Sequence, residues 1–361
     1  MDERTREEAV ELLEKFSQAH GASGEESEVR RIFRSELGEG VTADRAGDMI
    51  CERKGSADFP RLMVAAHMDE VGLMVQSITA GGMLKFVTLG GWWAHTLPAK
   101  RVRVRTRSGE EIPGVIGAKP PHFLSDAERD KLVKIEDMFI DVGAGSAEEA
   151  AKFGVRVGDT IVPDSPFVRM RHPDLLLSKA FDDRAGLSVV VHAARLLGSM
   201  PHPNTVFAAG TVQEEVGTRG AGTAAFHVNP DVAIVCESAP ADDFPGTAPE
   251  ERQCALGGGV QIRFMDSSAI AHRKLIEFAV RTAEKHGIRH QLAVRRKGGT
   301  DAGPIHMHGA GVPTVVLATP ARYVHTHNTI VNITDYLCSL RLVLELVKAL
   351  DAAAVEELTR Y

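Results

Sequence analysis

The stretch Arg61-Leu62-Met63-Val64-Ala65-Ala66-His67-Met68-Asp69 decides the fold that we expect for this chain. Its central residues, 62–66, are all apolar, and an uninterrupted apolar run of this length is typical of a strand buried on both faces of a parallel sheet. The run breaks off in two polar residues, His67 and Asp69. The stretch therefore predicts an α/β protein with polar side chains at the end of a central strand.

The sequence on both sides of this strand alternates between helix and strand patterns. Residues 4–16 repeat apolar side chains with the spacing of one helical face. After residue 167 helices and strands alternate, which is typical of a mixed sheet with helices on both faces. The elements expected there are a helix at 183–197, strands at 205–209 and 232–236, a helix at 269–286, a strand at 314–317 and a helix at 334–350.

Between residues 71 and 167 the pattern changes to short β-branched runs separated by glycines. Residues 100–106 alternate cleanly between polar and apolar side chains, and residues 154–162 nearly do so, as half-buried strands do. We therefore expect a small all-β module, a barrel or a sandwich, at 71–167. It would be inserted into a discontinuous α/β domain formed by residues 1–70 and 168–361.

Composition excludes several classes of protein. The 361 residues contain 42 Lys and Arg against 49 Asp and Glu, a net charge of -7, so no general positive field is available to hold nucleic acid. The strongest apolar candidate, 187–197, is broken by His192 and Arg195 and falls short of the roughly 20 residues of a membrane helix. The N-terminus lacks the pattern of a signal peptide, and the four cysteines are scattered. We therefore expect a cytoplasmic protein with reduced thiols and no membrane partner.

Polar side chains that can perform chemistry gather where apolar runs end. In α/β sheets ligands bind beyond the carboxyl ends of the strands, so residues far apart in sequence can converge there. Several carboxylates cannot share a dry pocket as anions unless cations compensate them. Two histidines with several carboxylates form a ligand set for zinc, cobalt or manganese, and two ions balance the charge better than one. The side chains at such ends are His67, Asp69, Asp182, Asp183, Glu214, Glu215, Glu237, and His325 with His327. No motif requires His327 as a metal ligand, so it is left out of the ligand set.

Five motifs make the sequence resemble one enzyme family. They are AHMDEVG at 66–72, FDDRAG at 181–186, QEEVG at 213–217, GGTDAG at 298–303 and PARYVH at 320–325. In this order they resemble the motifs of the tetrahedral aminopeptidases, also called glutamyl or deblocking aminopeptidases, some of which carry an endoglucanase label. The resemblance covers nearly the whole chain. It implies a binuclear metallo-aminopeptidase with a phosphorylase/peptidase-like catalytic domain.

The resemblance also implies a ligand set for two divalent metal ions in each subunit, zinc or cobalt, with manganese as a further candidate. The implied ligands are His67 and Glu237 for one ion, His325 and Glu215 for the other, and Asp182 as a bridge between the two. Many relatives carry Asp where Glu237 stands. Asp242 or Asp243 is therefore the alternative for that ligand.

The catalytic roles follow from the same resemblance. A hydroxide bound to both metals would attack the N-terminal peptide bond. Glu214 would act as the general base that takes the water proton and returns it to the leaving amine, and Asp69 would orient the imidazole of His67. Related enzymes hold the Asp182–Asp183 peptide bond cis, and we expect a cis bond here.

Two local features depend on the residues themselves. Neighbouring side chains on a regular strand point to opposite faces, so Glu214 and Glu215 can serve one site only from a loop. The turn that contains Gly299 and Thr300 has two interpretations. Thr300 or Asp301 could cap the helix that follows, or the glycines could let the backbone approach a substrate, which makes Gly299 and Thr300 candidate substrate-binding residues.

Assembly and substrate also rest on the resemblance. It implies that the β module is a dimerisation domain and that dimers build a tetrahedral dodecamer with an internal chamber. Only short or unfolded peptides with a free N-terminus would reach the metals. The preferred N-terminal side chain stays open, because relatives favour acidic, basic or apolar residues.

Three other functions stay open on the sequence. A deacylase or dipeptidase could use the same two metals on a small N-acyl substrate. A glycoside hydrolase could use Glu214 and Glu215 as its carboxylate pair, but it would have no use for His67 or His325. A non-catalytic assembly protein is the last alternative, although every ligand position of the family is filled by a competent residue.

Overall fold

A computed structural model describes residues 2–360, and its largest element is a mixed sheet. Eleven strands of these residues form the sheet, in the order β1-β2-β12-β3-β13-β16-β17-β11-β10, with β14 pairing β16 and β15 pairing β14. The strands are β1 Val41–Ala43, β2 Met49–Lys54, β3 Arg61–His67, β10 Val168–Arg169, β11 Leu175–Ser178, β12 Thr205–Thr211, β13 Val232–Pro240, β14 Val260–Met265, β15 His290–Val294, β16 Thr314–Arg322 and β17 Thr329–Asn332.

Four parallel strands, β12, β3, β13 and β16, form the centre of the sheet. Ala65 of β3 lies in register with Ala209 of β12 and with Val235 of β13. The neighbours β2, β14 and β17 run antiparallel to this centre. The carboxyl ends of the parallel strands therefore meet at one edge, where α/β sheets bind their ligands.

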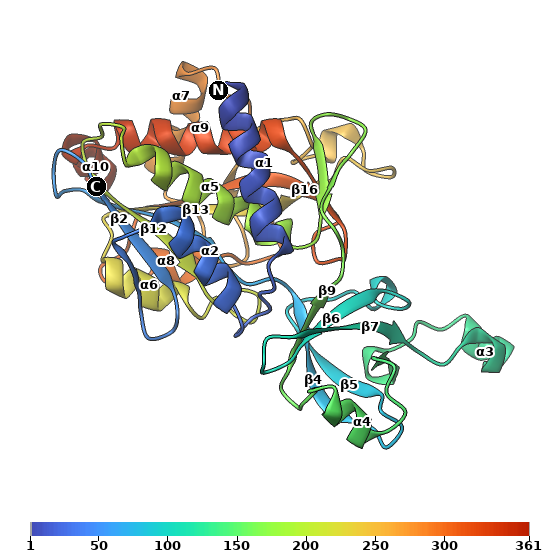
Figure 1. The fold of residues 1–361 in the computed structure, drawn as a ribbon. Helices are drawn as coiled ribbons and strands as arrows, with labels where there is room; N and C mark the ends of the chain where they lie inside the picture. Colours follow the sequence, from blue (N-terminus) through green and yellow to red (C-terminus); the bar gives the residue numbers. More distant parts are fainter. Residues whose placement is uncertain (1, 361) are drawn as a thin grey trace.

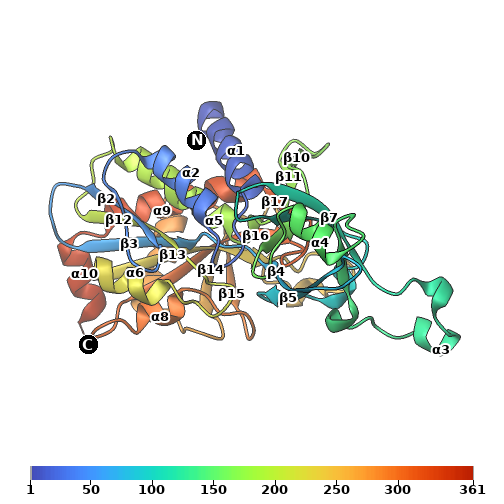
Figure 2. The same ribbon diagram turned by 60° about the horizontal axis from the view of Figure 1, so that its bottom comes forward.

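Helices cover both faces of the sheet, with α6 and α8 on the face opposite α2, α5 and α9 (Figure 2). Along β3, Val64 and Ala66 enter the larger hydrophobic core, whereas Met63 and Ala65 enter a smaller core shared with α6 and α8, because successive side chains alternate between faces. The helices of this part are α1 Glu3–Gln18, α2 Ser27–Leu37, α5 Phe181–Leu197, α6 Ala221–Val228, α7 Arg273–Lys285, α8 Ala302–His306, α9 Ile333–Ala349 and α10 Ala352–Thr359.

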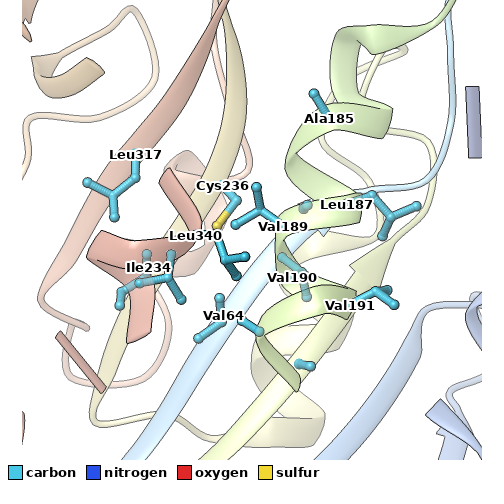
Figure 3. Close-up of a cluster of buried hydrophobic side chains, with 14 of the residues drawn as sticks. Val64, Ala185, Leu187, Val189, Val190, Val191, Ile234, Cys236, Leu317 and Leu340 are labelled. Atoms are coloured by element: carbon cyan, nitrogen blue, oxygen red, sulfur yellow. The ribbon is translucent and has the colours of Figure 1, made fainter. Parts of the chain in front are cut away.

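Helix α5 runs through the larger core. Its residues 187–191 are all buried, as expected for a helix that is apolar on every side. Figure 3 shows Val189 and Val190 on the side of the helix toward Val64 of β3, Ile234 of β13 and Leu340 of α9, and Leu187 and Val191 on its other side. Packing on three elements fixes the start of the helix, where Asp182 lies.

A second sheet closes into a barrel beside the first (Figure 1). Its strand order is β4-β5-β8-β7-β6-β9, and it has a separate core around Leu73, Val104 and Ile140. Two short helices join the barrel, and the segment that holds α3 projects away from it in Figure 1. The elements are β4 Gly72–Ile78, β5 Leu84–Leu89, β6 Arg101–Arg105, β7 Glu111–Gly117, α3 Asp126–Arg129, β8 Phe139–Asp141, α4 Ala147–Lys152 and β9 Thr160–Pro163.

The predicted fold class, a mixed α/β sheet with a small all-β module, is confirmed. Several predicted elements have different bounds, and two of them begin several residues later than expected. Within the strand expected at 154–162, only the part in β9 forms a strand. The residues before it do not, because Gly154 and Gly158 turn the chain with φ of 93° and 90°. The helix expected from residue 269 begins at Arg273, because Asp266 holds the preceding residues in a turn by accepting hydrogen bonds from the N–H groups of residues 268 and 269.

Two further sequence expectations concern cysteines and membranes. All four cysteines are free, and Cys51, Cys236 and Cys254 are buried, whereas Cys338 is half-buried. The expectation that most of the thiols are buried is therefore confirmed. Within residues 2–360, no helix combines the length and the apolar character needed to cross a bilayer.

The buried His192 of α5 should make stability depend on pH. Its Nδ1 lies 3.3 Å from Oη of Tyr336, and burial lowers its pKa from 6.5 to about 4. The unfolded chain takes up this proton below pH 6.5, whereas the folded chain resists it until about pH 4. Above pH 6.5 this group therefore leaves the free energy of unfolding unchanged. As the pH falls from 6.5 to 4, the free energy of unfolding decreases by about 3 kcal/mol because of this group.

We expect His192→Gln to remove that part of the pH dependence. The measurement is the free energy of unfolding in urea at pH 7, 5.5 and 4 for both proteins. The wild-type protein should lose more stability than the variant over this range. Parallel pH profiles would contradict the assignment.

Candidate metal centre

The carboxyl edge of the sheet collects the predicted side chains from separate elements. His67 ends β3, Asp182 lies at the start of α5, Glu214 and Glu215 follow β12, Glu237 lies within β13, and His325 follows β16. Glu214 and Glu215 lie in a loop. A loop is required if these two neighbouring side chains are to reach the same site. The structure thus brings together residues that are spread over more than 250 positions of the chain.

Asp182 lies between two histidines. Its Oδ1 is 3.5 Å from Nε2 of His67, and its Oδ2 is 3.3 Å from Nε2 of His325. Oε2 of Glu215 lies 3.3 Å from the same His325 nitrogen. The peptide bond between Asp182 and Asp183 is cis, as the resemblance predicted. The carboxylate of Asp182 is thus placed as a bridge between two imidazoles.

Glu237 belongs to the same cluster. It forms a group with His67 and Asp183 whose ligand atoms lie within 4.8 Å of one another. Asp242 and Asp243, the alternatives for this position, are engaged elsewhere. Asp242 accepts hydrogen bonds from the N–H groups of residues 253 and 254, and Asp243 pairs with an arginine at 2.7 and 2.6 Å.

Asp69 connects the His67 strand to the loop of the two glutamates. Nδ1 of His67 lies 3.0 Å from the backbone oxygen of Asp69 and 3.4 Å from its Oδ1. The carboxylate of Asp69 also accepts the N–H groups of Glu214 at 2.9 Å and Glu215 at 3.2 Å, and the hydroxyl of Ser23 at 2.6 Å. Asp69 therefore both faces the imidazole and holds the loop in place.

Burial makes so many carboxylates hard to ionise. Burial, together with repulsion from Glu237, raises the pKa of Glu214 to about 10, and burial raises the pKa of Glu237 well above its usual range. Burial alone would lower the pKa of His325, but its hydrogen bonds to Asp182 and Glu215 outweigh that effect and raise it to about 11. Burial is the main cause of the raised pKa of the two carboxyls, and neighbouring negative charge adds to it. Neighbouring negative charge is what raises the pKa of His325.

The donor set fits divalent metal ions. Among residues 2–360, Oε1 of Glu215 and Oδ2 of Asp183 are buried without a hydrogen-bond partner, which is costly for a carboxylate oxygen. The two residues belong to different candidate metal groups, Glu215 with His67 and Asp182, and Asp183 with His67 and Glu237, so bound cations would offer these oxygens partners. Imidazole nitrogens with carboxylate oxygens suit zinc, cobalt and manganese.

An open groove of about 800 Å³ leads to the cluster. Its lining includes Gly91, Gly217 and Thr218 as well as the cluster itself, and the basic residues Arg263, Arg295, Arg296 and Lys297. Gly299 and Thr300 also line the groove. The hydroxyl of Thr300 donates to Asp266 at 2.9 Å and its N–H to Ser268 at 3.0 Å, so Thr300 has no free donor for a substrate.

The turn does start a helix, because α8 begins at Ala302, but the expected side-chain cap is not formed. Asp301 precedes α8, but its side chain makes no capping hydrogen bond. It accepts a hydrogen bond from the hydroxyl of Thr211 at 2.5 Å instead. The side chain thus faces the carboxyl end of β12 rather than the helix terminus.

Sequence reasoning missed two residues of the site. Ser23 lies in a Gly/Ser-rich turn that carries no signal for contact with Asp69, so only the fold reveals it. Arg263 is 5% exposed in the apolar strand β14. A charge inside an apolar strand is a signal that could have been found, since buried charges need a partner or a ligand.

The sequence matches a known peptidase family. The family described as M42 glutamyl aminopeptidase matches residues 47–342. The chain belongs to this family. Among solved structures, it is similar to the TET aminopeptidase of a marine sediment archaeon, Thaumarchaeota archaeon SCGC AB-539-E09, with a TM-score of 0.94, 44% identity, and 98% of this chain and 99% of that chain covered.

Two other similar proteins cover the chain almost completely. The glutamyl aminopeptidase of Lactococcus lactis is 34% identical over 360 residues, which are 98% of this chain and 100% of the relative. The TET1 peptidase of Pyrococcus horikoshii, which can assemble into a tetrahedron or a large octahedral shell, has a TM-score of 0.85 and 34% identity, with 95% and 100% covered. The resemblance inferred from the five motifs is confirmed, and the chain is a metal-dependent aminopeptidase, a hydrolase of peptide bonds.

Asp182→Ala should lose bound metal, because it removes a carboxylate whose two oxygens face different histidines. We expect the divalent metal content per subunit to fall by at least half after dialysis against metal-free buffer, measured by mass spectrometry of the metal. Asp242→Asn is the matched control, because its carboxylate lies in a nearby loop and outside the cluster. Wild-type metal content in the Asp182→Ala protein would contradict this centre.

Proposed function

We propose that this M42 aminopeptidase removes single residues from the N-termini of short peptides with the help of two divalent metal ions in each subunit. One observation carries the proposal. The two oxygens of the Asp182 carboxylate face different histidines, His67 at 3.5 Å and His325 at 3.3 Å. A carboxylate shared in this way suits a pair of ions rather than one.

The ligands follow from the neighbours of each histidine. His67 and Glu237 would hold one ion, His325 and Glu215 the other, and Asp182 both. Two observations support this division. His67 and Glu237 belong to one candidate metal group, and His325 lies 3.3 Å from Glu215. Zinc and cobalt are the preferred ions and manganese is a further candidate, since all three accept imidazole and carboxylate ligands.

The side chains around these ligands supply proton transfer and orientation. When bound, two divalent ions polarise the scissile carbonyl and lower the pKa of water. The charge of bound ions would lower the pKa of Glu214, which burial and Glu237 raise in their absence. Glu214, whose Oε2 lies 3.9 Å from Nε2 of His67 and which lines the groove, would then accept the proton of the attacking water on its carboxylate. It then delivers that proton to the leaving amine. Asp69 keeps the His67 imidazole and the Glu214 loop in position through the contacts described above.

The basic residues that line the groove favour substrates with an acidic N-terminal residue. They are Arg263, Arg295, Arg296 and Lys297. Arg263 is the most enclosed of the four, and it contacts Gln261 at 3.1 Å and Asp266 at 3.5 Å. Guanidinium groups bind carboxylates by paired hydrogen bonds. We therefore propose that Arg263 binds the side-chain carboxylate of an N-terminal Glu or Asp.

Two alternatives receive less support from the site. A glycoside hydrolase has no role for His67 and His325, which lie at the centre of the cluster. A deacylase or dipeptidase could use the same ligands, so it differs only in substrate. The family and the aminopeptidase relatives favour peptides with a free N-terminus.

We also propose that the chain assembles from dimers into a tetrahedral dodecamer. Residues 71–167 would form the dimerisation domain, and residues 1–70 with 168–361 the catalytic domain. The assembly of the Pyrococcus horikoshii relative supports this proposal, and the four free cysteines support a reducing, cytoplasmic location. A light-scattering mass near twelve times 39.0 kDa is expected, and a monomeric mass would contradict the assembly.

Glu214→Gln should abolish turnover and retain the metals. The substitution keeps the size of the side chain but removes its ability to take a proton, so kcat should fall by about 10²- to 10⁴-fold. The measurements are kcat on an aminoacyl p-nitroanilide and metal content. Glu110→Gln, in a hairpin turn of the barrel, is the control. Near-normal kcat in Glu214→Gln would refute the general-base role.

Arg263→Met should reverse the preference for acidic residues. We expect kcat/KM on glutamyl p-nitroanilide to fall by about 10- to 100-fold, because a carboxylate loses its paired cation, while leucyl p-nitroanilide changes little. Arg296→Met at the exposed rim should have a much smaller effect. Cleavage of N-acetylglutamate in preference to the glutamyl substrate by the wild-type protein would favour the deacylase alternative.

A further inference from the structure

Glu70 belongs to a buried cluster of charges that the proposed reaction does not use. Its Oε1 accepts a hydrogen bond from Nζ of Lys179 at 2.6 Å and lies 3.4 Å from Nη2 of Arg184. The three side chains are at most 1% exposed. Among residues 2–360, Oε2 of Glu70 has no hydrogen-bond partner. One carboxylate oxygen therefore joins two buried cations.

Both cations are also anchored to the end of α1 and the turn that follows it. Lys179 donates to the carbonyl of Ala19 at 2.9 Å, and Arg184 donates to the carbonyls of Phe16 at 2.6 Å and Gly21 at 3.1 Å. The N–H of Glu70 donates to the same Gly21 carbonyl at 2.9 Å. A Cβ on Gly21 would lie 2.5 Å from Nη2 of Arg184, so this close contact requires glycine.

The cluster connects segments that carry proposed metal ligands. Glu70 directly follows Asp69 and is three residues beyond His67, whereas Lys179 and Arg184 lie on either side of Asp182. Asp69 in turn holds the N–H groups of the loop with Glu214 and Glu215. Three of the segments that form the metal centre are therefore linked through residues 69 and 70.

We infer that Glu70 is a positioning residue of the metal centre, which sets the distance between the His67 strand and the Asp182 turn through Lys179 and Arg184. The inference rests on the proposed function, since it assigns Glu70 to the ligands of that site. A neutral residue at position 70 leaves two cations without their shared counter-ion. The segments then separate, and small displacements of ligands and of the groups that orient them weaken metal binding.

The test measures metal binding in Glu70→Gln, which keeps the size of the side chain and removes its charge. Zinc affinity is measured by competition with a chromophoric chelator, and ligand geometry by the visible absorption spectrum of the cobalt-loaded protein. We expect at least tenfold weaker zinc binding and a changed cobalt spectrum. The double variant Glu70→Gln/Lys179→Met removes one of the uncompensated cations, so it should fold more readily than the single variant but bind zinc equally weakly.

Glu36→Gln is the matched control. Glu36 likewise joins two cations, Lys15 and Arg195, but it lies in the last turn of α2, and Arg195 is at the opposite end of α5 from Asp182. This variant should keep wild-type zinc affinity. An equal loss of affinity in this control would overturn the inference, because any disturbed ion pair would then suffice.

The outcomes separate the inference from the proposed function. If the wild-type protein binds no zinc, cobalt or manganese, the proposed function fails. If the wild-type protein binds zinc and either Glu70 variant retains its affinity and cobalt spectrum, the inference about Glu70 fails alone. If the double variant does not fold, the cluster is needed to stabilise the fold rather than to position the metal ligands. That result would also overturn the inference.

Discussion

Repulsion among buried carboxylates is the constraint on which the arrangement of this site depends. Asp182, Glu214, Glu215 and Glu237 all reach the carboxyl edge of one sheet, in contact with or close to His67. Side by side and out of water, such groups cannot all be ionised unless cations share the space. The same excess of charge that would destabilise a metal-free protein gives the site its affinity for divalent ions. Ligand binding and folding stability are therefore linked in this chain.

The backbone around the site carries strain of its own. Within residues 2–360, several non-glycine residues adopt left-handed φ angles next to ligand segments, namely Ala180 at 58°, Gln213 at 56°, Thr218 at 49°, Tyr323 at 63° and His325 at 56°. Each such residue costs about 1–2 kcal/mol. Strained loops persist when rigid elements hold both ends, and here those elements are α5, β12 and β16 with their buried core. The large core thus supports the irregular segments in which chemistry takes place.

The sequence predicted the fold class and the gathering of ligands because both depend on local patterns. An apolar run that ends in His67 and Asp69 identifies a strand and its polar end at once. The cluster of Glu70, Lys179 and Arg184 could not be predicted, because nothing local distinguishes a buried lysine from an exposed one. Element bounds failed where polar contacts override apolar spacing, as at residues 266–272, where a carboxylate holds a turn that the helical pattern had included.

The inserted barrel takes part in the site through two glycines that follow β5. A Cβ on Gly90 would lie 3.1 Å from Oε2 of Glu215, and one on Gly91 would lie 3.3 Å from Nδ1 of His325. Gly90 also has a φ of 83°, which favours glycine. The barrel segment thus packs its bare backbone against the Glu215 and His325 side of the cluster and forms part of the groove wall. An insertion that merely covered the sheet would not need such close contact, so the barrel and the metal centre must be kept in register for the groove to retain its shape.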